Sequence, residues 1–567
     1  MSTRDHRRAT RGVCDIWSRR TFMRGLSGFA AAGIAGRVVP GLGPIGRIAL
    51  AQETGPGDVV ETTAGRIRGA TRAGIHIFKG VRYGASTGGP NRFMPPIAPA
   101  PWTGIHDALE FGASAPQSRP HPVKSEDCLF LNVWTPGLGD GRRRPVMVWL
   151  HGGGFSAGSG SSRTYDGVNM CTAGDVVLVT INHRLNIFGS AYLAELAGSE
   201  FAASGCVGML DIIASLEWVR DNIEAFGGDP NTVTVFGESG GGRKVSTLLA
   251  MPGANGLFHR AIIESGAILR VRNPRDATSE ATRLLAKVGL RRGQGRELQR
   301  IPTDTLFAAS LEVARELEPE ERVVGMTDNT PVLDGDAIPA HPFDPTATSI
   351  SVDVPVIVGY NRTEETLSWQ NREMPLDMTD GELLERIAAR LASDVDAPRV
   401  VEAYRDAYQE ARPWDLYILI CTDHPRGMYA RELAARKTAL GGAPAWLYRF
   451  DWDMGGELKT PHALEIRFVF DNVDHFETRL FDQPGSAASR ALAAKMSAAW
   501  MAFARTGNPD TPGLPTWPVY STDTREAMLF NNESRIVRDH DRGPRLVMEE
   551  VLKLGLSVLL HSHLSWQ

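Results

Sequence analysis

The sequence of 567 residues contains few cysteines, no long hydrophobic run and no excess of basic charge. Its five cysteines are widely spaced and include no C-x-x-C pair; a chain of this length does not need disulfides to fold, and the sequence does not fix their pairing. No apolar stretch approaches the roughly 20 residues that a membrane-spanning helix needs. The net charge of -5 gives no electrostatic reason to expect nucleic acid or an anionic membrane as a partner. The absence of a fixed repeat argues against a solenoid or propeller.

The first fifty residues differ in kind from the rest of the chain. Arg19 and Arg20 precede a modest apolar run, and small residues around Ala51 offer a cleavage site before Gln52. This pattern resembles a twin-arginine export signal of bacteria, and a disordered basic tail is the alternative. We therefore predict a leader over 1–51 and a mature catalytic chain over 52–567 that is periplasmic or secreted.

Apolar runs and amphipathic stretches alternate through the remainder. The apolar runs predict buried strands and the amphipathic stretches predict helices. Strands are expected at 146–150, 231–237, 353–361 and 443–452 and within 174–185 and 258–267. Helices are expected at 211–226, 244–251 and 491–507. We also expect antiparallel strands within 59–84, a more helical region at 275–350 and a docking helix at 551–567. Because the strands are scattered from end to end, we predict one α/β domain: a mostly parallel central sheet flanked by helices, with long loop and helical insertions.

The pattern G-x-S-x-G occurs three times, around Ser86, Ser156 and Ser239. A nucleophile elbow needs a strand before the serine and a helix after it. Only Ser239, in "NTVTVFGESGGG", follows a β-favouring run and precedes a helical stretch, whereas the other two lie in Gly- and Ser-rich segments that predict loops. Ser239 is therefore the candidate nucleophile.

A serine nucleophile needs a histidine base and an acid that orients it, and in hydrolases of this kind they follow in the order serine, acid, histidine. Glu364 and Glu365 stand just after the strand at 353–361, where side chains emerge at the carboxyl edge of a sheet, although solvated loop glutamates are the ordinary reading of such a pair. His462 lies in a loop after the strand at 443–452, and His475 is its local rival.

The developing oxyanion requires backbone N–H donors from a glycine-rich loop and from the residue after the nucleophile. "HGGGF" follows the strand at 146–150 and offers Gly153 and Gly154, and Gly240 follows Ser239. Glycine allows the backbone to approach a substrate closely because it has no Cβ.

Together these motifs resemble the type-B carboxylesterase family of α/β-hydrolases. The resemblance spans nearly all of the mature chain, through "FKGVRYG", "SEDCLFLNVWTP", "VWLHGGGFSAGS", "VFGESGGG", "VGYNRTEET" and "HALEIRFVF". It implies a Ser-Glu-His triad with an oxyanion hole. It also makes Ser265 a position that hydrogen-bonds within the triad, and a strand-end serine that caps a turn is the alternative. The residues to which it assigns roles are Ser239, Glu364, His462, Gly153, Gly154 and Gly240, with Ser265 and Glu238 around them.

Three positions depart from the family pattern. Gly240 stands where alanine is usual, and Glu365 stands where glycine is common, which leaves the register of the acid open. Cys128 has no upstream partner between residues 15 and 127, so the family's loop disulfide is absent. The segment 111–124 has no tryptophan, so we expect poor use of choline esters.

The predicted activity is hydrolysis of carboxylic esters through an acyl-enzyme, with a small-molecule ester and water as partners and no metal or organic cofactor. A lipase, lactonase or amidase with the same triad is the alternative, and a non-catalytic binding module of this fold is a more remote one. His561 and His563 have no partners at ligand spacing, which favours a surface or packing role. The sequence does not predict the oligomeric state.

Overall fold

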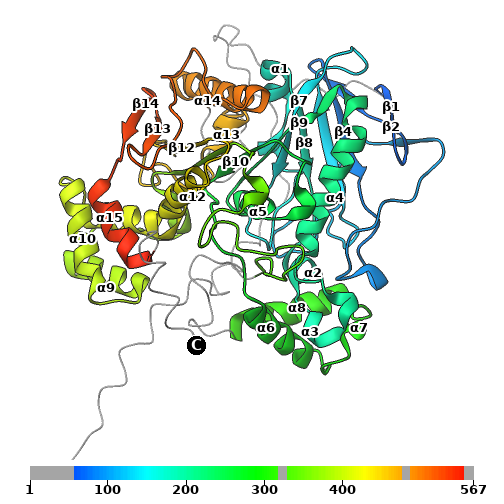
Figure 1. Cartoon of the computed structure of the whole chain (residues 1–567), viewed down its shortest axis with the longest axis horizontal. Coiled ribbons are helices and arrows are strands. Elements are labelled where there is room, and N and C mark those ends of the chain that lie inside the picture. Colours follow the sequence, from blue (N-terminus) through cyan, green and yellow to red (C-terminus); the bar gives the residue numbers. More distant parts are fainter. Residues whose placement is uncertain (1–56, 317–328, 475–484, 554–567) are drawn as a thin grey trace, which may run out of the picture. The chain divides into compact units, whose positions relative to one another are not determined.

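The computed structural model describes residues 57–316, 329–474 and 485–553, which all belong to one compact unit, Gln52–Gln567. In this part of the chain eleven strands form one sheet, in the order β14-β13-β12-β11-β10-β9-β7-β8-β6-β4-β3 (Figure 1). A small second sheet contains β1, β2 and β5. The strands are β1 Val59–Thr62, β2 Gly65–Arg68, β3 Ala70–Arg72, β4 Ile75–Arg82, β5 Ile105–Asp107, β6 Phe130–Thr135, β7 Arg144–Leu150, β8 Val177–Ile181, β9 Gly228–Glu238, β10 Arg260–Glu264, β11 Val356–Asn361, β12 Ala445–Phe450, β13 Glu526–Phe530 and β14 Arg535–Arg538.

The large sheet is parallel in its centre and antiparallel at its margins. All neighbouring pairs from β8 through β7 and β9 to β13 are parallel, whereas β3, β4, β6 and β14 join antiparallel. The chain adds β8 on one side of β7 and β9 on the other. In open α/β sheets, ligands bind beyond the carboxyl ends of the strands at such a switch in strand order. The segments that follow β7 and β9 are therefore placed at the ordinary site of function.

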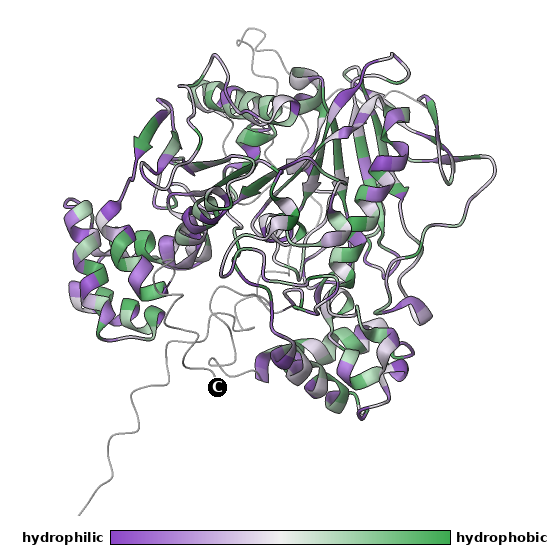
Figure 2. Ribbon diagram, viewed as in Figure 1, coloured by the Kyte–Doolittle hydropathy of each residue, from purple (hydrophilic) through white to green (hydrophobic). Residues whose placement is uncertain are grey.

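Alternate residues of the central strands enter two separate hydrophobic cores. In β7, Val146 and Val148 pack into one core, and Met147 and Trp149 pack into the other. Successive side chains of a strand point to opposite faces, so a strand that is covered on both faces is apolar throughout (Figure 2). Helices α4 Val207–Asn222, α5 Gly240–Leu248 and α12 Met428–Ala439 cover the first face, and α1 Val168–Gly174, α13 Ile466–Val469 and α14 Ala487–Thr506 cover the second.

The remaining helices form two groups outside these layers (Figure 1). One group shares a small core of its own and consists of α2 Asn186–Ser190, α3 Ala194–Ala197, α6 Pro274–Lys287, α7 Gly295–Leu298 and α8 Thr303–Glu316. The other consists of α9 Asp380–Leu391, α10 Asp396–Ala407, α11 Pro413–Thr422 and α15 Arg542–Leu552. The expected α/β architecture with helical insertions is thus confirmed.

The helix boundary next to Ser239 differs from the expected one, and one expected helix is largely untested. The helix after Ser239 begins at Gly240 instead of near Lys244, because the glycines wind into its first turn instead of forming a loop. The docking helix expected at 551–567 lies mostly outside the described residues, and α15 ends at Leu552. Among the described helices, none is long and apolar enough to cross a membrane.

Candidate active site

Ser239 occupies a sharp turn between β9 and α5. Its φ of 55° and ψ of -117° are strained for a residue with a side chain. The turn is possible because its neighbours lack side chains: a Cβ on Gly241 would lie 1.8 Å from the carbonyl oxygen of Leu150, and one on Gly237 would lie 2.5 Å from the same atom. This is the geometry of a nucleophile elbow. Ser86 and Ser156 lie in irregular segments.

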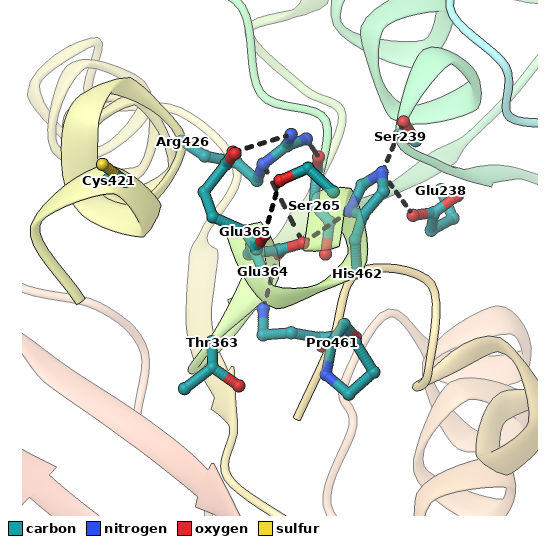
Figure 3. A network of polar contacts seen from close by, with 12 residues as sticks. Glu238, Ser239, Ser265, Thr363, Glu364, Glu365, Cys421, Arg426, Pro461 and His462 are labelled. Atoms are coloured by element: carbon teal, nitrogen blue, oxygen red, sulfur yellow. Dashed lines mark hydrogen bonds and ion pairs between the residues drawn. The ribbon is translucent and has the colours of Figure 1, made fainter. Parts of the chain in front are cut away.

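The structure brings Ser239, His462 and Glu364 into one hydrogen-bonded line (Figure 3). Nε2 of His462 lies 2.7 Å from Oγ of Ser239, and Nδ1 lies 2.5 Å from Oε2 of Glu364. The second carboxylate oxygen of Glu364 accepts from the backbone N–H of Asn361 at 2.8 Å. These residues come from the ends of β9 and β11 and from the loop after β12, where parallel strands bring their carboxyl ends to one edge.

The glycine-rich loop after β7 lies directly against the elbow. A Cβ on Gly240 would lie 2.4 Å from the nitrogen and 2.2 Å from the oxygen of Gly154, so the two backbones are in contact. Gly153 and Gly154 have φ of 97° and 65°, conformations that favour glycine. No N–H group of Gly153, Gly154 or Gly240 donates to another described residue. Three unused donors beside a serine hydroxyl suit the stabilisation of an oxyanion.

Comparison with known proteins decides the family. The model of the carboxylesterase family matches residues 56–547. This chain belongs to the carboxylesterase family. It is 35% identical over 503 residues to the para-nitrobenzyl esterase of Bacillus subtilis (strain 168), an alignment that covers 86% of this chain and 97% of that protein. It is 31% identical to the phenmedipham hydrolase of Pseudarthrobacter oxydans, over 85% of this chain and 97% of the relative.

A solved carboxylesterase of Geobacillus stearothermophilus has a similar structure, with a TM-score of 0.77 and 36% identity over 86% of this chain and 99% of that one. The protein is therefore a carboxylic-ester hydrolase of the α/β-hydrolase fold, as the sequence predicts. The esterase has its mostly parallel sheet and the layers of helices in common with these relatives.

Arg426 is a neighbour of the triad that no motif in the sequence marks. It lies in the turn Asp423–Gly427 between α11 and α12, and its Nε is 3.8 Å from Oε2 of Glu364. Its Nη1 donates to the backbone carbonyl of Ser265 at 3.0 Å, which fixes the guanidinium beside the carboxylate (Figure 3). A spacing of 62 residues between Glu364 and Arg426 gives no local signal from which this pairing could be foreseen.

The charges around the imidazole determine its protonation. Burial acts to raise the pKa of Glu364, but the charges of His462 and Arg426 and the hydrogen bonds to the carboxylate together hold this pKa below its usual range. Burial, and next the positive charge of Arg426, lower the pKa of His462, although Glu364 acts against them. The pair consequently presents an ionised acid and a neutral imidazole, which is the state required of a general base.

Glu238 brings a second carboxyl group to the same imidazole. Its Oε1 is 3.1 Å from Nε2 of His462, and only 2% of the residue is exposed. Burial, and then the negative charges of Glu465 and Glu364, raise the pKa of Glu238 well above its usual value. The pKa values of two carboxyl groups near one imidazole thus shift in opposite directions: burial outweighs Arg426 at Glu238, whereas His462, Arg426 and the hydrogen bonds outweigh burial at Glu364.

Ser265 does not bond to a member of the triad, contrary to the prediction from the resemblance. Its hydroxyl donates to Oε1 of Glu465 at 2.6 Å, and the other oxygen of Glu465 accepts from the side chain of Asn361 at 2.5 Å. Asn361 in turn contacts Glu364 through its backbone N–H. The hydroxyl of Ser265 therefore reaches the triad through Glu465, which the sequence did not single out, and Asn361. The backbone carbonyl of Ser265 reaches Glu364 through Arg426.

The two rival glutamates are separated by position. Glu364 is fully buried at the imidazole, whereas the Glu365 side chain is 22% exposed and faces Nη2 of Arg426 at 3.7 Å. Consecutive residues at the start of a 3₁₀ helix, here Glu364–Trp369, point in different directions. His475, His561 and His563 lie outside the described residues. In the described part of the chain, no group of three or more His, Cys, Asp or Glu side chains could hold a metal ion.

The four cysteines of the described residues are all buried and unpaired: Cys128, Cys171, Cys206 and Cys421. Two basic residues directly after the elbow also have defined positions. Arg243 is partly buried, whereas Lys244 is fully buried and its Nζ donates to the backbone carbonyl of His151 at 2.9 Å. Lys244 therefore has a partner inside the protein and does not reach solvent.

Proposed function

We propose that this carboxylesterase hydrolyses esters through an acyl-enzyme on Ser239, with His462 as general base and Glu364 as the acid that orients it. The observation that carries the proposal is the continuous contact from Oγ of Ser239 to Nε2 of His462 and from Nδ1 to the carboxylate of Glu364. A neutral imidazole in this position accepts the hydroxyl proton as the oxygen attacks an ester carbonyl.

The proposed cycle has two transfers of the same form. Ser239 Oγ bonds to the carbonyl carbon, and the negative oxygen of the tetrahedral intermediate accepts hydrogen bonds from Gly153, Gly154 and Gly240. When the ester C–O bond breaks, His462 gives its proton to the departing alcohol. Water then attacks the acyl-serine by the same steps, releases the carboxylic acid and regenerates the hydroxyl.

Labelling tests the role of the serine directly. Treatment with an organophosphate should leave one adduct on Ser239, located by mass spectrometry of its peptide. The rate of hydrolysis of a 4-nitrophenyl ester should fall in proportion to the labelled fraction of the enzyme. Ser239→Ala should neither label nor turn over. An active protein that carries no adduct at Ser239 would contradict the assignment.

For the substrate, we infer a preference for esters over amides. Support for an ester with a benzyl-type alcohol comes from the Bacillus relative, whose name is para-nitrobenzyl esterase. A panel of 4-nitrophenyl esters of rising acyl length, a para-nitrobenzyl ester and the matching anilides would distinguish esterase, lipase and amidase. Faster turnover of the anilides, or a rate that rises with long acyl chains at a lipid interface, would contradict it.

We further propose that residues 1–51 direct export by a twin-arginine route. The support is the pair Arg19 and Arg20 ahead of an apolar run and the small residues before Gln52. Replacement of both arginines with lysine should leave active enzyme inside the cell, measured by cell fractionation and esterase assay. Unchanged export would overturn the proposal.

A further inference from the structure

Lys244 is a buried basic residue that has no carboxylate partner in the described part of the chain. It lies in α5, five residues after Ser239, and is fully buried. Among the described residues, no ion pair involves Lys244, and the acceptor of its Nζ is a backbone carbonyl. A buried ammonium group without an ion-pair partner is costly to the folded state, so its position calls for an explanation.

The contacts of this ammonium group are with the glycine-rich loop. Its Nζ donates to the carbonyl of His151 at 2.9 Å, and it lies 5.6 Å from the ring centroid of Phe155. A hydrogen bond from a charged donor and a cation–π contact are both favourable in a buried setting. His151 begins the loop and Phe155 ends it, so one side chain holds both ends of the segment that contains Gly153 and Gly154.

The backbone of α5 is close enough to this loop for such a contact to fix its position. Cβ atoms on Gly240 and Gly241 would lie 2.2 Å from the carbonyl oxygen of Gly154 and 1.8 Å from that of Leu150. The first turn of α5 therefore touches the loop through glycines. One turn later, the side chain of Lys244 reaches the same loop and bonds to the carbonyl of His151.

We propose that Lys244 is a positioning residue for ester hydrolysis, which holds the loop His151–Phe155 so that the N–H groups of Gly153 and Gly154 face the tetrahedral intermediate. The inference rests on the proposed role of those two N–H groups as an oxyanion hole. The side chain touches no reacting atom and acts through the loop.

The groups that face Lys244 agree with this role. The rings of His151 and His183 stack with centroids 5.1 Å apart, and burial, followed by the charge of Lys244, lowers the pKa of each. Burial, and then the charge of Arg243, lower the pKa of Lys244 to about 7, while Glu238 acts in the opposite direction. Neutral imidazoles add no further positive charge beside the Lys244 side chain, whose hydrogen-bond acceptor is the carbonyl of His151.

Lys244→Met tests the inference, since methionine fills similar space without a donor or a charge. Lys437→Met is the matched control: Lys437 in α12 is also buried, and its Nζ donates to the carbonyls of Ser351 at 2.7 Å and Val352 at 2.8 Å. Each variant is assayed for kcat and KM on 4-nitrophenyl acetate, for Ki with an aryl trifluoromethyl ketone, which forms a tetrahedral adduct on serine, and for thermal unfolding.

A displaced oxyanion donor weakens the transition state more than the bound substrate. We expect Lys244→Met to lower kcat about tenfold or more, to change KM less than about twofold, and to raise the Ki of the ketone in proportion to the loss of kcat/KM. Lys437→Met should change the unfolding temperature but leave kcat, KM and the Ki of the ketone unchanged. If Lys244→Met is insoluble, Lys244→Leu, which also lacks a donor and a charge, replaces it in the same comparison.

Two results would overturn the inference: kcat and ketone Ki within twofold of the wild type in the Lys244 variant, or equal losses of activity in both lysine variants. Organophosphate labelling of the wild type on Ser239 separates this failure from that of the proposed function. If the wild type is labelled and active, only the role of Lys244 is refuted; if it is not labelled, the proposed function itself fails.

Discussion

Arg426 lies beside Glu364, with 3.8 Å between Nε and Oε2, and thereby adds a positive charge to the far end of the serine–histidine–glutamate line. Burial and this charge lower the pKa of His462 from 6.5. The base must be neutral to act, so activity falls as the pH decreases through that pKa. We expect the acid limb of the pH profile of kcat/KM to lie below pH 6.5, measured with a neutral 4-nitrophenyl ester.

Removal of the Arg426 charge should move this limb. Arg426→Gln withdraws the cation that lowers the pKa of His462, so the limb should shift to higher pH. Arg390→Gln is the control, because Arg390 donates to the backbone carbonyl of His424 in the same turn at 2.8 Å without being among the groups that shift the pKa of His462. Equal acid limbs in both variants would show that Arg426 does not act on the imidazole.

The acid can be distinguished from its neighbour by a matched pair of variants. Glu364→Gln keeps the shape of the side chain but loses the charge that orients His462, and in a comparable triad such a change lowers kcat about 10⁴-fold. Glu365→Gln should change kcat less than about threefold, because Glu365 faces Arg426 and not the imidazole. Comparable losses of kcat in the two variants, measured on the same ester, would contradict the assignment of Glu364 as the acid.

The strained backbone of Ser239 predicts an unusual order of stabilities. Ser239→Ala and Ser239→Gly should both lower kcat at least about 10⁴-fold. The glycine variant should nevertheless unfold at a higher temperature than the alanine variant, because glycine adopts φ of 55° and ψ of -117° without the strain of about 1–3 kcal/mol that a Cβ imposes. Calorimetry of the two variants measures the difference, and a more stable alanine variant would argue against strain at the elbow.

Gly240→Ala should be harmful here, although the family resemblance makes alanine the usual residue at this position. Its Cβ would lie 2.4 Å from the nitrogen of Gly154, so the loop or the helix must move. We expect a loss of about 1–3 kcal/mol in unfolding free energy and of about tenfold or more in kcat through the displaced donors. Gly253→Ala is the control, since its Cβ meets only Ile213 at 3.4 Å. Full activity in Gly240→Ala would show that this contact is readily relieved.

Glu465 should make stability depend on pH. Burial, and then the charge of Glu364, raise its pKa from 4.5 to about 8. A raised pKa in the folded state stabilises the fold below pH 4.5, and this contribution is lost as the pH rises towards 8. Glu465→Gln cannot lose a proton, so its unfolding free energy relative to the wild type should improve by about 3–4 kcal/mol from pH 5 to pH 8. Denaturant titrations of both proteins at both pH values measure this difference. An equal difference in unfolding free energy at pH 5 and pH 8 would contradict the raised pKa.

The sequence by itself determined the α/β architecture, the elbow at Ser239, the glycine loop and the base His462. These features depend on local patterns: the period of apolar residues, a strand–glycine–helix junction and motifs of a few consecutive residues. Only the tertiary structure decided between Glu364 and Glu365, because the choice depends on how a turn directs two adjacent carboxylates. The tertiary structure alone also revealed that Arg426 lies beside Glu364, that Lys244 bonds to the glycine-rich loop, and that the Ser265 hydroxyl bonds to Glu465. A buried polar group pairs with the groups that the fold packs against it, and these can be distant in sequence.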